Sequence, residues 1–177
     1  DQTSWFPFAR FIAESGYKVF TFDFRGYGKS TGIKDTRMDR DLEAAIAYMR
    51  AKGAQQVVLI GASMGGTAVI ELASESQVQG VAALSPPAEF GRINALTAVE
   101  SMVIPLLLIV SENDYQYYSD ARKIESAAAA TQFLVVEGQQ HGTNMIAEHR
   151  NEIFANLLAF LDRWTDDRLL TTVQTES

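Results

Sequence analysis

The chain has 177 residues, 15 of them basic and 22 acidic, and its formal net charge of −7 argues against a nucleic-acid partner held by a basic surface. Apolar residues make up 47% and charged residues 21%, a balance typical of a globular chain rather than a disordered one. The absence of cysteine excludes disulfides, a thiol nucleophile and a zinc–thiolate site. His141 and His149 are the only histidines, so we expect no histidine-rich metal site.

Short runs of β-branched and aromatic residues recur along the chain, and most are almost continuously apolar, as strands covered on both faces are. They alternate with segments of helical period, which predicts an α/β fold with a mostly parallel sheet and helices on both faces. The sheet is expected to have about five strands, over residues 18–24, 56–60, 80–84, 105–110 and 132–136.

The helices are expected between these runs. A first helix over 5–15 ends at Gly16, a typical C-terminal cap. Further helices are expected around 38–50, 68–74, 119–130 and 147–164. No apolar run approaches the roughly 18 residues that a membrane span requires. We expect one domain over 1–164, and a polar tail over 165–177 with no further element.

The sequence Gly61-Ala62-Ser63-Met64-Gly65-Gly66 lies between the second expected strand and a helix. A serine on so tight a turn takes strained backbone angles and projects its hydroxyl above the sheet, and small residues two positions before and after it prevent clashes. We predict that Ser63 is a nucleophile and that the N–H of Met64 points at a developing oxyanion. The alternative is a glycine-rich turn that only packs a helix against the sheet.

A serine hydroxyl becomes a good nucleophile only when a base takes its proton, so a histidine and an orienting acid are required. Functional groups in parallel sheets lie at the carboxyl ends of strands. Asp114 follows the fourth expected strand and His141 follows the fifth. The chain order Ser63, Asp114, His141 is the one expected for such a sheet.

Each assignment has an alternative in the sequence. Glu112 is a second candidate for the acid, and Asp114 could instead cap the following helix. His149 is the rival base, but it lies within an expected amphipathic helix, where a solvated face suits it better.

Residues 5–164 resemble the α/β-hydrolase superfamily. Besides the serine turn and the three candidate catalytic residues, the resemblance rests on the family's D-x-R-G-x-G-x-S turn, which matches Asp23-Phe24-Arg25-Gly26-Tyr27-Gly28-Lys29-Ser30. The resemblance implies hydrolysis of an ester or related acyl bond of a small substrate through a serine acyl-enzyme, without a cofactor. It also implies that the D-x-R-G-x-G-x-S turn is structural, with Arg25 stabilising the loop.

The chain departs from the family at two places. The strand and loop that normally lie just upstream and supply the second oxyanion N–H are absent, so we expect a C-terminal portion of a longer, cytoplasmic hydrolase, impaired as it stands, with residues 1–4 a remnant of that loop. Residues 85–104 are too few for a large helical cap. Candidate walls of an open cleft are Pro86, Pro87, Phe90, Met102, Tyr115, Tyr117 and Tyr118, although most could equally be core or loop residues.

Other functions remain open on the same scaffold. One is a ligand-binding module that no longer turns over substrate, and another is a cofactor-free oxidative or C–C bond-cleaving role. An aminopeptidase-like or thioesterase activity also fits, because leaving-group preference depends on the shape of the pocket.

Overall fold

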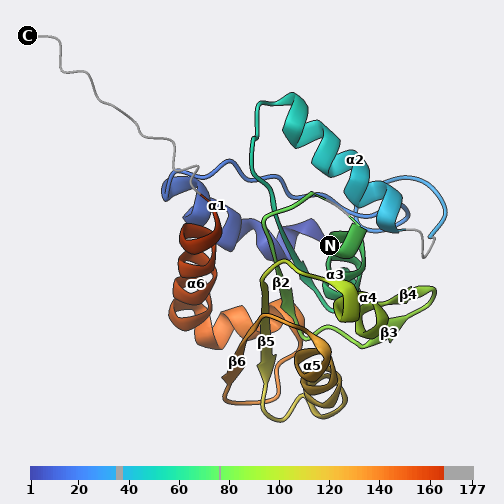
Figure 1. Cartoon of the computed structure of the whole chain (residues 1–177). Coiled ribbons are helices and arrows are strands. Elements are labelled where there is room, and N and C mark those ends of the chain that lie inside the picture. The colour runs from blue at the N-terminus through green and yellow to red at the C-terminus, as the bar shows by residue number, and fades with distance from the viewer. Residues whose placement is uncertain (35–37, 76, 166–177) are drawn as a thin grey trace, which may run out of the picture.

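A computed structural model of the chain describes residues 1–34, 38–75 and 77–165. Its main sheet has four parallel strands in the order β1-β2-β5-β6 (Figure 1). The strands are β1 (Val58–Ala62), β2 (Gly80–Leu84), β5 (Leu106–Ser111) and β6 (Thr131–Val136). The expected α/β class and parallel sheet are confirmed.

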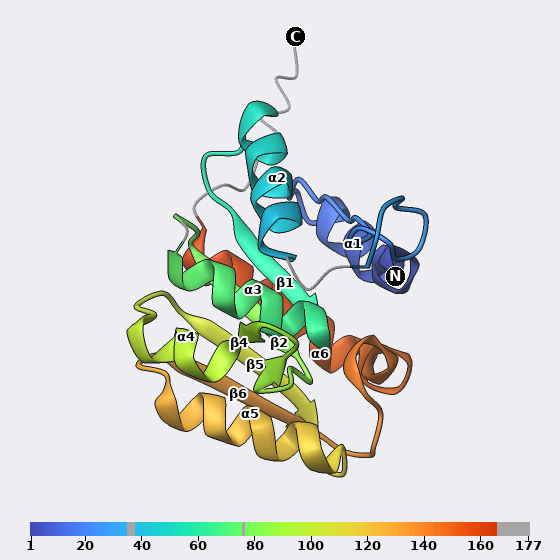
Figure 2. The same ribbon diagram turned by 90° about the vertical axis from the view of Figure 1, so that its right-hand side faces the viewer.

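The helices cover both faces of the sheet, with α3, α4 and α5 on one face and α6 on the other (Figure 2). Helix α1 packs on α6, and α2 packs on α3. The helices are α1 (Phe6–Glu14), α2 (Met38–Ala51), α3 (Met64–Glu75), α4 (Ala95–Ser101), α5 (Tyr115–Ala127) and α6 (Met145–Trp164). Two 3-10 turns, η1 (Gln2–Trp5) and η2 (Gly142–Asn144), lie beside each other.

Two hydrophobic cores lie on opposite faces of the sheet because successive side chains of a strand point in opposite directions. In β2, Val81 and Ala83 belong to the core under α3 and α4, whereas Ala82 and Leu84 belong to the core under α1 and α6. Every residue of β2 and β5 is buried. These two strands form the centre of the sheet, and the candidate site lies at the carboxyl end of the sheet, after β1, β5 and β6.

The expected strand over residues 18–24 is wrong, and the main sheet has four strands instead of five. The segment has strand-type residues, but no ladder joins it to any described strand. A cavity of about 620 Å³ lies between it and β1, lined on the other sides by α1 and α2. A strand requires a neighbour within about 4.8 Å for its N–H and C=O groups, and here the neighbouring position is open space.

The connection between β2 and β5 holds a short hairpin, β3 (Glu89–Phe90) with β4 (Ile93–Asn94), followed by α4. The hairpin and α4 were not predicted from the sequence. Helix α4 has its buried side chains in the core shared with α3. Of the polar tail expected over residues 165–177, residues 166–177 lie outside the described part of the chain.

Candidate active site

Ser63 lies on the one-residue turn between β1 and α3, with a φ of 52°. Its N–H donates a hydrogen bond of 2.8 Å to the carbonyl oxygen of Leu84, the last residue of the neighbouring strand β2. The turn is tight enough that a Cβ built on Gly61 would lie 2.2 Å from the carbonyl oxygen of Gly65. Glycine at position 61 is therefore required by close contact, as the motif predicts.

Gly65, two positions after the serine, has a different environment. A Cβ built there would meet only the Phe24 side chain, at an ordinary 3.6 Å. The requirement for small residues around Ser63 is therefore strict before the serine and relaxed after it.

The structure brings Ser63, Asp114 and His141 together from three different strand ends. The distance from His141 Nε2 to Ser63 Oγ is 2.8 Å, and the distance from His141 Nδ1 to Asp114 Oδ2 is also 2.8 Å. Asp114 is buried, whereas the His141 side chain is 32% exposed. The arrangement forms a hydrogen-bonded relay that runs from the buried Asp114 through His141 to Ser63, and the latter two residues are partly exposed.

The alternatives for the acid are placed elsewhere. The exposed carboxylate of Glu112 accepts a hydrogen bond of 3.1 Å from Asn113 Nδ2. Asp114 occupies the N-cap position of α5 but makes no side-chain capping hydrogen bond. Its Oδ2 is instead directed at His141.

His149, the alternative base, lies at a kink in α6, where its φ of −115° is not helical. Its Nε2 lies 2.8 Å from the carbonyl oxygen of Glu137, just after β6. The side chain is 20% exposed. His149 is therefore half-buried on α6, and its imidazole bonds the loop that precedes this helix instead of joining the relay.

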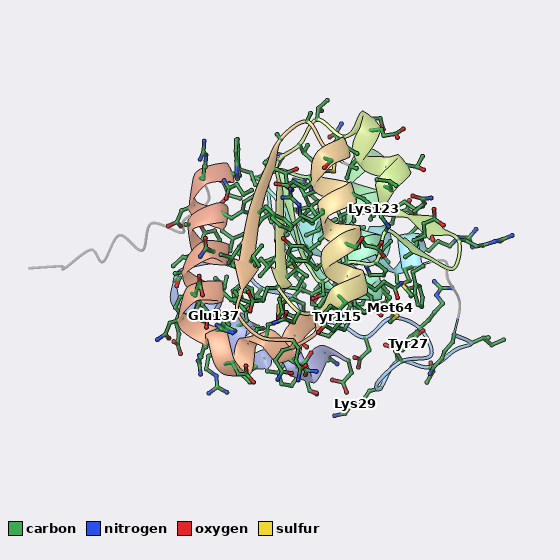
Figure 3. The ribbon with its side chains drawn as sticks, turned by 90° about the horizontal axis from the view of Figure 1, so that it is seen from below. Tyr27, Lys29, Met64, Tyr115, Lys123 and Glu137 are labelled. Atoms are coloured by element: carbon green, nitrogen blue, oxygen red, sulfur yellow. The ribbon has the colours of Figure 1, made fainter. Side chains whose placement is uncertain are left out.

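Met64 is the first residue of α3, and its N–H donates a hydrogen bond to no residue within the described ranges. Figure 3 shows Met64 at the same end of the sheet as Tyr115, the first residue of α5. Among residues 1–4, the N–H of Gln2 donates to Asp23 Oδ1 at 2.6 Å, and the N–H of Thr3 donates to Asp1 Oδ1 at 2.9 Å. The amides of Gln2 and Thr3 are thus engaged elsewhere.

The D-x-R-G-x-G-x-S turn is held by its first residue. The backbone N–H of Lys29 donates to Asp23 Oδ2 at 3.0 Å, and Gln2 donates to the same carboxylate. The hydrogen bond from Lys29, followed by that from Gln2, holds the pKa of Asp23 below its ordinary value. A Cβ built on Gly28, at a φ of 51°, would collide with this carboxylate.

Arg25 pairs with a carboxylate on α2. Its Nε donates to Asp41 Oδ1 at 2.8 Å, and its backbone N–H donates to Asp41 Oδ2 at 3.0 Å. These contacts join the turn to α2 and agree with the structural role expected for Arg25.

The candidate wall residues divide into two groups. Pro86, Pro87 and Met102 are buried, and Met102 belongs to the core under α3, together with the half-buried Phe90. Tyr115 is 78% exposed. Tyr117 is the candidate in contact with the relay: its ring centroid lies 4.0 Å from that of His141. Tyr118 instead contacts Phe133.

Two buried serines that the sequence analysis did not single out contact the His141 loop. Ser85 follows β2 directly, and Ser111 ends β5. The Ser111 hydroxyl donates to the carbonyl oxygen of Gln140, and the N–H of Gly142 donates to the Ser85 hydroxyl. Their position at strand ends is the signal that could have identified them.

Within the described ranges, no group of three or more His, Cys, Asp or Glu side chains is placed to hold a metal ion. In the same part of the chain, no helix has both the length and the apolar character needed to cross a membrane.

The sequence model of the alpha/beta hydrolase fold matches residues 3–123, more than half of the chain. The chain belongs to the alpha/beta hydrolase fold family. The matched range includes Ser63 and Asp114 and ends before His141.

The matches to curated relatives cover a smaller part of the chain. The uncharacterized protein YfhR of Escherichia coli (strain K12) is 28% identical over 88 residues, which are 48% of this chain and 31% of that protein. The YfhR protein of Salmonella typhi is 30% identical over 74 residues, 40% of this chain and 25% of the relative. The chain thus matches about a third or less of the length of these relatives.

Solved structures share the fold over most of the chain. An esterase of Pyrococcus furiosus has a TM-score of 0.76 at 23% identity, covering 89% of this chain and 74% of the esterase. A monoacylglycerol lipase of Paleococcus ferrophilus has a TM-score of 0.77 at 16% identity, and the match covers 92% of this chain and 90% of the lipase. The esterase domain of a Rhodothermus marinus protein has a TM-score of 0.75 at 22% identity, covering 93% and 82%.

Proposed function

We propose that the protein is a serine hydrolase that cleaves an ester or related acyl bond of a small molecule. The observation that carries the proposal is the continuous relay from Asp114 through His141 to Ser63, with both contacts at 2.8 Å. The fold family and the similarity to esterases and a lipase support it. In this proposal Ser63 is the nucleophile, His141 the general base and Asp114 the orienting acid.

The first half of the reaction forms an acyl-enzyme. His141 Nε2 takes the proton of Ser63 as its Oγ attacks the substrate carbonyl carbon, and Asp114 stabilises the imidazolium through Nδ1–H. The negative charge that develops on the carbonyl oxygen is stabilised by the N–H of Met64 at the start of α3. The tetrahedral intermediate collapses when the leaving alkoxide takes the proton from His141.

The second half releases the acid. Water gives a proton to His141 Nε2 and attacks the acyl carbon, and the proton returns to Ser63 Oγ as the ester bond to the enzyme breaks. No step requires a cofactor or a metal ion. All proton transfers use the one imidazole.

A fluorophosphonate probe with mass-spectrometric mapping tests the nucleophile. We expect one label per chain on Ser63, no label after Ser63→Ala, and full labelling after the control Ser126→Ala, an exposed serine on α5. Labelling that persists in Ser63→Ala would contradict the proposal. Hydrolysis of p-nitrophenyl acetate by the same variants gives an independent measurement.

A ligand-binding module without turnover is the second candidate. It is favoured by one observation: the amides of Gln2 and Thr3, in the segment beside η2, are already engaged. Loss of one oxyanion donor lowers the rate on the order of 10²–10³-fold. Stoichiometric labelling of Ser63 without measurable ester turnover would favour this candidate.

A further inference from the structure

The two peptide groups that flank His141 are each held by a buried serine hydroxyl. On one side, Ser111 Oγ donates to the carbonyl oxygen of Gln140 at 2.6 Å. On the other, the N–H of Gly142 donates to Ser85 Oγ at 3.1 Å. Ser85 and Ser111 are both 0% exposed. The backbone around the imidazole is therefore held by two hydrogen bonds to buried hydroxyls, of which the one to Ser85 is fully buried and the one from Ser111 is partly buried.

Ser85 also adjoins the residue that holds the nucleophile. The N–H of Ser63 donates to the carbonyl oxygen of Leu84, and the N–H of Ser85 donates to the carbonyl oxygen of Ile109 in β5, both at 2.8 Å. The two consecutive residues Leu84 and Ser85 thus bond both the Ser63 turn and the His141 loop. A shift of this junction would change the distance between Nε2 and Oγ directly.

The backbone of Ser85 is strained. Its φ of 46° lies in the left-handed region, and Ser63 is the other described residue besides glycine with a positive φ. Glycine would adopt this conformation without strain. Strain of this kind at a buried position points to a function for the side chain. The contact that the Ser85 hydroxyl makes is the hydrogen bond that it accepts from the N–H of Gly142.

A further side-chain hydrogen bond of the loop is exposed. Gln140 Nε2 donates to Glu148 Oε1 at 2.9 Å on the surface, where water competes for both groups. Gly142, with a φ of 57°, lies beside the Ser63 turn, since a Cβ built on it would come within 3.9 Å of the Cβ of Ser63. The loop itself contacts the nucleophile through His141 Nε2, 2.8 Å from Ser63 Oγ, so displacements of the loop backbone are transmitted to the relay.

We propose that Ser85 and Ser111 are positioning residues that set the spacing between His141 and Ser63. The proposal rests on the function proposed above and adds to it the two groups that hold the base. Neither serine is assigned a contact with substrate. Each acts through the backbone on one side of His141.

The test uses Ser85→Gly and Ser111→Ala. Ser85→Gly removes the hydroxyl and relieves the backbone strain, so the protein is expected to fold. We expect the rate constant for fluorophosphonate labelling of Ser63, and kcat for p-nitrophenyl acetate, to fall on the order of 10–100-fold in each variant, because misplacement by about 1 Å can cost 10²-fold. KM and the final stoichiometry of one label per chain are expected to stay unchanged. If the two serines only supported folding, the substitutions would instead lower the stoichiometry.

A second arm uses the His141→Ala background. If the serines act through His141, Ser85→Gly causes no further loss of labelling rate there, whereas independent effects would multiply. The control Ser126→Ala is expected to label as the unaltered protein does. Unaltered labelling rates in both Ser85→Gly and Ser111→Ala, with Ser63 labelled normally, would overturn the inference and leave the proposed function intact. Failure of the unaltered protein to label at Ser63 would overturn the proposed function and the inference together.

Discussion

The two edges of strand β1 differ in whether a neighbouring strand pairs with its backbone N–H and C=O groups. On one side β1 pairs with β2 along its whole length, and the ladder continues through β5 to β6. On the other side, residues 18–24 form no ladder with it, and a cavity of about 620 Å³ separates the two. Apolar side chains line this cavity, among them Phe8, Ile12, Phe20, Phe22, Met49 and Leu59.

The difference shows which part of the fold positions the relay. Ser63, Asp114 and His141 follow strands of the paired side, where buried hydrogen bonds fix the strand ends. The open side contributes Phe24 near Gly65 and the Asp23 turn. We therefore expect substitutions on the paired side to affect chemistry strongly, and substitutions on the open side to affect mainly stability.

The largest effect is expected from the acid of the relay. Asp114→Asn should lower kcat for p-nitrophenyl acetate by about 10³–10⁴-fold, because the amide cannot hold the His141 tautomer or stabilise its charge. Steady-state kinetics measure this. Glu112→Gln, at an exposed position two residues earlier, should leave kcat unchanged. A large loss in Glu112→Gln alone would reverse the assignment.

The next effect concerns the glycines around Ser63, which border the two sides. Gly61→Ala should lower the free energy of unfolding by at least ~1–3 kcal/mol, because the new Cβ would overlap a backbone carbonyl. Gly65→Ala should unfold at nearly the same urea concentration as the unaltered protein, since its new methyl meets Phe24 at van der Waals distance. Equal destabilisation by both substitutions would contradict the asymmetry of the turn.

On the open side, Asp23 is expected to act through stability. The hydrogen bonds from Lys29 and then Gln2 lower the folded-state pKa of Asp23. The stability that the ionised Asp23 contributes is therefore fully present above the ordinary pKa of about 4, and it is lost as the pH falls through the lower pKa of the folded state. Asp23→Asn should lower the free energy of unfolding by about 1 kcal/mol at pH 7. In urea unfolding at successive pH values, the difference between the two proteins should shrink below about pH 4. Glu14→Gln, an exposed change on α1, is the control, and a difference that grew on acidification would contradict the prediction.

The smallest effect is expected at the ring beside His141. Tyr117→Ala should lower kcat/KM by up to about tenfold, the size expected for loss of one aromatic contact of 0.5–1.5 kcal/mol. Tyr117→Phe, which keeps the ring, should retain the activity. Tyr115→Ala, at an exposed position on the same helix, is the matched control. A loss in Tyr117→Phe as large as in Tyr117→Ala would assign the effect to the hydroxyl.

The prediction of the fold from the sequence succeeded where periodicity and local rules decide the structure. The four runs that became β1, β2, β5 and β6 are apolar over most of their length, because both faces of the sheet are covered by helices. The run over residues 18–24 is also rich in β-branched and aromatic residues and yet is no strand. Composition describes what a segment can form, whereas pairing depends on whether another segment lies beside it.

The kink at His149 and the hairpin β3–β4 show the same limit. The helical period of α6 gives no sign that residue 149 leaves helical angles to reach the Glu137 carbonyl. The two-residue strands β3 and β4 are too short for an alternating pattern to identify.

The sequence by itself determined the parallel α/β class, the Ser63 turn and the candidates Asp114 and His141, because strand ends and glycine spacing are local properties. Only the tertiary structure decided that His141 meets Ser63 and Asp114 at hydrogen-bonding distance and that Glu112 and His149 lie outside this relay. It also decided that Ser85 and Ser111 hydrogen-bond the peptide groups on the two sides of His141. The physical reason is that these contacts join residues 27 to 78 positions apart, and packing of the strands brings them together.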